Sequence, residues 1–130
     1  MTLQVCVMTP DKIFCNQKAE EIILPTNTGQ MGVLTNHAPL ITALDIGVML
    51  MRTNKEWSST ALMGGFALVK QNQVTLLVNE AESKETINVQ EAEEAFQKAK
   101  EKLEQAEGQK EKVEAMFSFK RARARYQVVS

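Results

Sequence analysis

Residues 2–79 alternate between apolar and polar positions with a period of two, which is the period of β-strands. In "TLQVCVM", for example, Leu3, Val5 and Val7 fall on one face. Turn-forming residues separate the apolar runs, as in "TNTGQ", "TNHAP", "TNKE", "GG" and "QNQ". Short strands at a spacing of about 8–12 residues predict a β-sandwich or flattened barrel rather than βαβ units. The runs "ITAL" and "LLV" are almost wholly apolar, so we expect central strands covered on both faces.

After Glu85 the apolar positions recur at alternating steps of three and four, which indicates an amphipathic helix. Asn88 is a suitable N-cap, and Glu91 stands where a capping box would close. The apolar stripe of this helix consists of Val89, Ala92, Phe96, Ala99, Leu103 and Ala106. Gly108 then interrupts the pattern, which resumes with Val113, Met116, Phe117 and Ala124.

The two helical segments can form either an antiparallel hairpin or one rod. Each has about 18 residues and a length of about 27 Å, and a helical Gly108 costs about 1 kcal/mol relative to Ala. Half of the first stripe is alanine, which buries little area, so we expect a hairpin that can open; the alternative is a hairpin permanently packed on the sandwich. The predicted fold is mainly β with an α appendage, a β-sandwich over residues 1–86 followed by an antiparallel helical hairpin over residues 87–130.

Charge is unevenly distributed along the 130 residues, although the net charge is only −1. Glu114 is the last acidic residue, and the stretch "FKRARAR" that follows (residues 119–125) is called the basic segment below. Its cations are Lys120, Arg121, Arg123 and Arg125. Helical spacing spreads them around the axis, which leaves three interpretations: a solvated helix face, a nucleic-acid hook and a contact for an acidic protein partner. The acidic remainder of the chain argues against nucleic acid.

The sequence contains no motif for catalysis, for a cofactor or for a metal ion. His37 is the single histidine and has no cysteine cluster beside it, so we do not expect a zinc site. Cys6 and Cys15 are expected to be ordinary thiols. Gly64–Gly65 in "LMGGFA" lacks the Gly-Lys-Ser/Thr ending of a phosphate loop and predicts a tight strand connection. No apolar run approaches the ~20 residues of a membrane span, so membrane association is expected to be indirect, through a partner.

The order of these features resembles the epsilon subunit of F-type ATP synthases. The stretch "EEIILPTNTGQMGVLTNHAPLITALDIG" precedes "ALMGGFA", and the "G-x-x-G-V-L-x-N-H-A-P" pattern within it is long and unusual. The opening "MTLQVCVMTPDK" and the ending "RARAR" are similar to the chloroplast and cyanobacterial branch. The resemblance covers essentially the whole chain. It implies a non-enzymatic rotor subunit of a proton-translocating synthase, peripheral to the thylakoid membrane on its stromal side, or on the cytoplasmic side in a cyanobacterium.

The resemblance also implies partners. The sandwich would link the gamma subunit to the ring of c subunits, and the C-terminal helices would restrain ATP hydrolysis. The positions carried over to the c ring are Thr26, Asn27, Thr28, Gly29, Gln30, Met31 and Gly32. Those carried over to gamma are Thr9, His37 and Thr42. The basic segment then becomes an inhibitory tip for acidic surfaces of the alpha/beta catalytic head, where Arg–carboxylate pairing can be bidentate.

One motif of the family is altered here. Some bacterial members bind ATP through "I/L-D-x-x-R-A" at the start of the first helix, and the matching stretch in this chain is "INVQEA". Asn88 replaces the aspartate and Glu91 replaces the arginine. Because a carboxylate at that position repels phosphate, we expect weak or absent ATP binding. An alternative to the whole interpretation is a β-sandwich adaptor with a helical arm, unrelated to ATP synthase.

Overall fold

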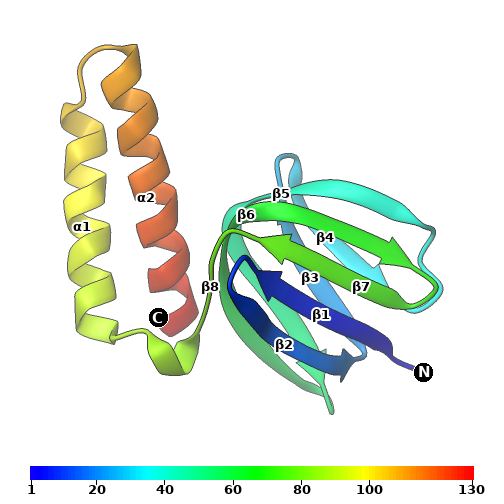
Figure 1. The fold of residues 1–130 in the computed structure, drawn as a ribbon. Helices are drawn as coiled ribbons and strands as arrows, with labels where there is room; N and C mark the ends of the chain where they lie inside the picture. Colours follow the sequence, from blue (N-terminus) through cyan, green and yellow to red (C-terminus); the bar gives the residue numbers. More distant parts are fainter.

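The computed structural model describes all 130 residues, as a β-sandwich joined to a pair of helices (Figure 1). The strands are β1 (Leu3–Thr9), β2 (Lys12–Ala19), β3 (Glu21–Thr26), β4 (Gly29–Leu34), β5 (Leu40–Thr53), β6 (Glu56–Lys70), β7 (Gln73–Val78) and β8 (Ala81–Ser83). They are followed by a 3-10 turn, η1 (Lys84–Thr86), and by the helices α1 (Val89–Gln105) and α2 (Gln109–Val129). The predicted fold class, a mainly β chain with a helical hairpin, is confirmed.

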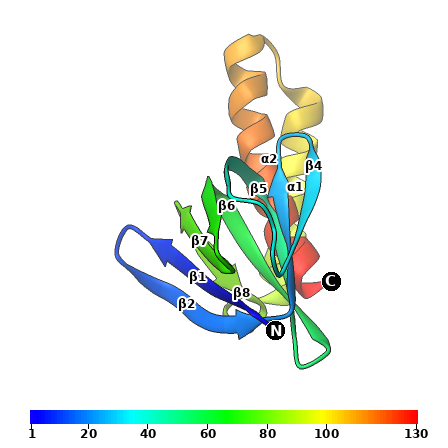
Figure 2. The same cartoon turned by 90° about the vertical axis from the view of Figure 1, so that its right-hand side faces the viewer.

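The strands form one sheet that folds over into two layers. Its order is β2-β1-β7-β6-β5-β3-β4, with β8 also paired to β6. β5 and β6 run through both layers, and their pairing skips Asp45 and Gly64, where the sheet passes from one layer to the other. We call β2, β1, β7 and the adjoining halves of β6 and β5 the β1 layer, and the remaining strand segments the β3 layer (Figure 2).

The hydrophobic core lies between the two layers and contains sixteen buried residues. Leu3, Val5 and Val7 point into it with no exposed surface, as their alternation predicts. The prediction that "ITAL" and "LLV" are covered on both faces is wrong for this chain by itself. Ile41 is 73% exposed and Leu77 is 53% exposed, because no element of the chain covers the outer face of the β1 layer.

The helices begin where local signals predict. The Asn88 side chain accepts a hydrogen bond from the Glu91 N–H at 3.0 Å, which confirms the N-cap, although the Glu91 carboxylate makes no reciprocal bond. Gly108, with a φ of 78°, is the N-cap of α2 and turns the chain back, so the two helices form an antiparallel hairpin rather than one rod. The C-terminus lies at the opposite end of the hairpin from this turn (Figure 1). Neither helix is long and apolar enough to cross a membrane.

A second, thinner cluster holds the helices on the sandwich. Along β6, Leu62 points into the core, whereas its neighbours Ala61 and Met63 point outward. The six buried residues of this cluster are Ala61, Met63, Ile87, Ala92, Ala124 and Val128. Helix α2 makes the contacts with β5 and β6. Since half of the cluster is alanine, it buries little apolar area compared with the core.

Candidate interaction surfaces

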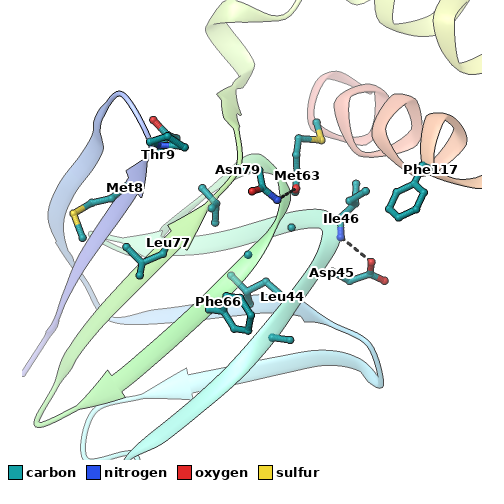
Figure 3. A pocket seen from close by; sticks show the side chains of 15 residues that line it. Met8, Thr9, Leu44, Asp45, Ile46, Met63, Phe66, Leu77, Asn79 and Phe117 are labelled. Carbon is teal, nitrogen blue, oxygen red and sulfur yellow. Dashed lines mark hydrogen bonds between the residues drawn. The ribbon is translucent and has the colours of Figure 1, made fainter. Parts of the chain in front are cut away.

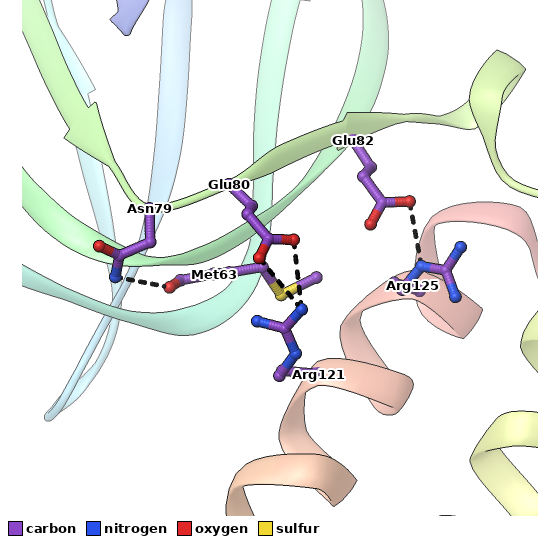
Figure 4. A network of polar contacts seen from close by, with 6 residues as sticks. All are labelled: Met63, Asn79, Glu80, Glu82, Arg121 and Arg125. Carbon is purple, nitrogen blue, oxygen red and sulfur yellow. Dashed lines mark hydrogen bonds and ion pairs between the residues drawn. The ribbon is translucent and has the colours of Figure 1, made fainter. Parts of the chain in front are cut away.

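The cations of the basic segment are not free in the folded chain. Three of them form ion pairs with acids of the sandwich: Lys120 with Asp45 (3.2 Å), Arg121 with Glu80 (3.2 Å) and Arg125 with Glu82 (3.0 Å). We call these three acids the acidic rim; Figure 4 shows two of the pairs. The Arg123 guanidinium lies over the Phe119 ring, 5.2 Å from its centroid.

Helical geometry explains this arrangement. Arg121 and Arg125 lie one turn apart, so they reach Glu80, between β7 and β8, and Glu82, on β8, which are two residues apart on the same extended stretch. Ala124 and Val128 pack on the sandwich beside them. The predicted inhibitory tip is therefore not at the free end of the hairpin, which is the turn at Gly108. No acid follows Glu114 along the chain, but in the folded structure three of the four cations pair with acids that are distant in sequence.

The outer face of the β1 layer carries a patch of uncovered apolar side chains, which we call the outer apolar face. It consists of Ile41 (73% exposed), Phe66 (59%), Leu68 (45%) and Leu77 (53%). Ile41 stands opposite Leu68, and Phe66 stands opposite Leu77, so the four side chains are cross-strand neighbours on one face. A contiguous apolar patch of this kind is typical of a protein–protein interface.

A groove separates the outer apolar face from α2. Its volume is about 610 Å³, and its lining is mainly apolar. Phe117 of α2 stands on one side, and Met8, Thr9 and Leu77 stand on the other (Figure 3). The groove makes the patch on the sandwich continuous with the exposed side of the second helix.

The structure does not bring the three residues predicted for gamma together. Thr9 ends β1 at the rim of the groove, where its hydroxyl donates to Asp11 Oδ1 at 2.8 Å and lowers the pKa of that carboxyl. Thr42 lies on β5, two strands beyond β7, and is half-buried on the core side opposite the buried Ala67. His37 lies in the loop before β5 with its Nδ1 2.7 Å from the Ala38 carbonyl oxygen.

The seven residues predicted for the c ring form the turn between β3 and β4. Thr26 Oγ1 donates to the Gly29 carbonyl oxygen at 2.6 Å, and this bond closes the turn. Asn27 and Thr28 are exposed at its tip, as are Gln30 and Gly32 in β4, while Met31 is half-buried against the core. The tip therefore offers polar side chains and backbone to a partner.

Comparison with protein-family models identifies both parts of the chain. Residues 2–84 match the ATP synthase delta/epsilon chain β-sandwich domain, and residues 85–130 match the ATP synthase delta/epsilon chain long α-helix domain. The chain belongs to the ATP synthase delta/epsilon chain family. The resemblance drawn from sequence motifs, to the epsilon subunit of F-type ATP synthases and its chloroplast branch, is confirmed.

Individual relatives agree with this family. The chloroplastic ATP synthase epsilon chain of Tupiella akineta is 78% identical over 130 residues, which is 100% of both chains. Among solved structures, a chain of the Euglena gracilis mitochondrial ATP synthase OSCP/F1/c-ring assembly has a TM-score of 0.82 at 21% identity, covering 95% of this chain and 78% of that one. A chain of the Tetrahymena thermophila mitochondrial ATP synthase central stalk/c-ring assembly has a TM-score of 0.70 at 14% identity, covering 100% and 98%. At these identities the two structures support the fold.

Sequence reasoning missed the most exposed apolar surface of this epsilon-family chain. Phe66 and Leu68 alternate with the buried Ala67 and Val69, and Leu77 follows the buried Leu76. This alternation could have revealed the outer apolar face, because apolar residues stand on both faces of β6. Only one of these faces can point into the core, and no segment of the chain covers the other. The sequence identified the cations of the basic segment but not the acids with which three of them pair, and its inhibitory role stays a prediction.

Proposed function

We propose that this chain is the epsilon subunit of a chloroplast F-type ATP synthase, a non-catalytic part of the central stalk that links gamma to the c ring and restrains ATP hydrolysis. The observation that carries this proposal is the match of both domains, with 78% identity to a chloroplastic epsilon chain along the full length. The adaptor alternative is not favoured, because no part of the chain falls outside this family.

Reconstitution tests the proposal directly. The purified chain is added to chloroplast F1 depleted of its own epsilon subunit, and co-purification and ATP hydrolysis are measured. We expect the chain to co-purify with gamma and the alpha/beta head and to lower the hydrolysis rate. A chain that stays unbound at micromolar concentration contradicts the proposal.

The outer apolar face supports a contact with gamma. Phe66 and Leu77 are uncovered on the outer face of the sheet, and Thr9 lies at its edge beside the groove. The contact then covers the sheet face that the chain leaves exposed. His37 lies in the loop before β5 and Thr42 on the core side of β5, so both would meet gamma only at the margin of this contact. The variant Phe66→Asp is expected to weaken gamma binding at least tenfold. The matched control is Trp57→Asp, since Trp57 is an aromatic side chain 48% exposed at the other end of β6.

The β3–β4 turn supports a contact with the c ring. Its polar tip matches a partner that presents polar loops. The turn points toward the same end of the molecule as the α1–α2 turn, whereas the C-terminus lies toward the other end (Figures 1 and 2). When the c ring contacts the tip of the β3–β4 turn, the C-terminal part of α2, which contains the basic segment, points away from the ring. A photo-crosslinking residue at Asn27 is expected to label the c subunit, and the same residue at Asn54, in the β5–β6 turn, is not.

The basic segment supports the restraint on hydrolysis. Its cations would engage acidic surfaces of the alpha/beta head when α2 leaves the sandwich, and association with the stromal side of the thylakoid membrane follows through the complex. Replacing all four cations by alanine is expected to abolish most of the inhibition. The control replaces four cations elsewhere on the hairpin by alanine: Lys98, Lys100, Lys102 and Lys110. Equal inhibition by the two variants contradicts a charge-based brake.

A further inference from the structure

We propose that the acidic rim is an internal competitor for the basic segment, holding its cations in the docked hairpin and thereby limiting how strongly the chain inhibits. The rim consists of Asp45, Glu80 and Glu82, as defined above. The docking part of this proposal stands on the contacts within the chain. Its effect on ATP hydrolysis rests on the proposed function.

The three carboxylates come from separate places in the sandwich but lie along one side of α2. Asp45 stands where β5 passes between layers, Glu80 stands between β7 and β8, and Glu82 lies on β8. Lys120 Nζ lies 3.3 and 3.2 Å from the two oxygens of Asp45, and an Arg121 terminal nitrogen lies 3.3 and 3.2 Å from those of Glu80. Figure 4 shows that both arginine side chains extend from α2 toward the segment that carries their acids.

All three pairs join the hairpin to the sandwich, and none joins the two helices to each other. They therefore stabilise the docked position without stabilising the hairpin itself. Arg123 is not part of this arrangement, since it stacks on Phe119 within its own helix. An undocked hairpin keeps the contacts between its two helices but loses these pairs and the thin apolar cluster, with the Ile46, Val48 and Val129 contacts around it. Because helices draw most of their stability from tertiary packing, the amides of α2 then exchange faster.

The size of the apolar cluster decides whether such pairs matter. It contains six buried residues, against sixteen in the sandwich core. The paired side chains are 25–53% exposed, so solvent screens them. A pair of this kind shifts an equilibrium by roughly 1.4- to 5-fold, and three together shift it by about 3- to 100-fold. Against a thin, alanine-rich contact, this range is enough to change the docked fraction.

A cation paired with the rim is not available to another carboxylate. The rim and an acidic surface of a partner therefore compete for the same side chains. Salt alone does not separate the two contacts, because it screens both within a Debye length of about 10 Å. Neutralising the rim does separate them, since it weakens the internal contact and leaves the basic segment unchanged.

The test uses the full chain with all three rim acids replaced: Asp45→Asn, Glu80→Gln and Glu82→Gln. The matched control replaces three exposed acids that have no cationic partner: Glu56→Gln, Glu85→Gln and Glu93→Gln. Hydrogen exchange of α2 in the isolated chain is expected to accelerate about 3- to 100-fold in the rim variant, with β7 unchanged as evidence of an intact core. With epsilon-depleted F1, the half-inhibitory concentration is expected to fall by a similar factor.

The two measurements separate the possible failures. Unchanged exchange of α2 in the rim variant overturns the proposal. Faster exchange with unchanged or weaker inhibition overturns the competition, while the proposed function stands. If even the unaltered chain does not inhibit, the proposed function fails, and exchange still decides whether the rim holds the hairpin. As a rescue, we combine Glu82→Arg with Arg125→Glu, which swaps the two charges. Glu82→Arg alone is expected to accelerate hydrogen exchange of α2, and the double variant is expected to slow it again.

Discussion

The rings of Phe96 in α1 and Tyr126 in α2 stack with their centroids 5.1 Å apart and their planes at 15°. Phe119 joins them, with its centroid 5.6 Å from that of Phe96. The buried residues on the α1 side are alanines, namely Ala92, Ala99 and Ala106. The hairpin is thus closed by an aromatic cluster as well as by alanines, and its two helices are held together more firmly than the alanine stripe alone implies.

Replacing Phe96 by leucine should therefore loosen the hairpin. An aromatic pair contributes about 0.5–1.5 kcal/mol beyond its buried area, so we expect Phe96→Leu to lower the free energy of opening by about 1 kcal/mol. Hydrogen exchange of α1 and α2 measures this, with Gln97→Leu as a control at the exposed neighbouring position. Equal exchange in the two variants would show that the ring stack contributes nothing.

Gly65 should tolerate no side chain. A Cβ at this position would lie 2.0 Å from the Leu77 carbonyl oxygen, and the residue has a φ of 151°. Because backbone atoms of β7 would have to move, we expect Gly65→Ala to destabilise the chain by about 3 kcal/mol or more. Gly32→Ala is the control, since nothing lies within 4 Å of a Cβ there. Urea denaturation compares the two, and similar midpoints would refute the steric argument.

Glu20 should contribute to the acid sensitivity of the fold. The Lys55 N–H donates to its carboxylate at 3.0 Å and the Asn54 N–H donates at 3.2 Å, and these bonds lower the pKa of Glu20. Since the folded pKa lies below the unfolded value of about 4.3, ionised Glu20 stabilises the fold above that pH. This stability is lost as the pH falls through the folded pKa.

The measurement is the urea midpoint at pH 7 and at successively lower pH. The Glu20→Gln variant is expected to lose less stability on acidification than the unaltered chain. Glu56→Gln serves as the control, because this exposed carboxylate accepts no hydrogen bond. A Glu20→Gln variant whose acid dependence matches that of the unaltered chain would contradict the role of the turn.

Residues 1–86 should fold without the hairpin, which tests the predicted domain boundary. All sixteen residues of the main core lie in the sandwich. Removing residues 87–130 uncovers the Ala61 and Met63 side of β6 and the Ile46 and Val48 side of β5 but leaves the main core intact, so we expect a cooperative unfolding transition at a somewhat lower temperature. Circular dichroism and calorimetry of the truncated chain check this. A truncated chain without a cooperative transition would mean that the two parts form a single folding unit.

Binding of ATP should be weak or absent. The first turn of α1 presents the Glu91 carboxylate, and the backbone N–H of Glu91 already donates to the Asn88 side-chain oxygen. Since neither group offers a positive charge to phosphate, we expect a Kd above ~1 mM, weaker than about −4 kcal/mol. Isothermal titration of the isolated chain with Mg-ATP measures this, and a millimolar or tighter Kd would overturn the expectation.

Local sequence patterns were enough for the elements and for the family. The alternation around Val5, the cap at Asn88 and the turn at Gly108 each depend on residues a few positions apart, so their physical cause is contained in a short window. The motif around His37 is likewise contiguous in the sequence, so it could be recognised without the structure. For these reasons the sandwich, the hairpin and the resemblance could be predicted before any packing was known.

The faces and partners of these elements depended on the tertiary structure. Leu77 would be covered if the helices packed on the β1 layer. They pack on the β3 layer, so Leu77 stays exposed. Lys120 meets Asp45 across 75 residues, and Arg125 meets Glu82 across 43. No local pattern encodes such a pairing, because it arises only when the hairpin folds back and α2 settles against the bend of β5 and β6. The sequence determined the elements and the charge of the last helix, and the packing decided what that charge meets.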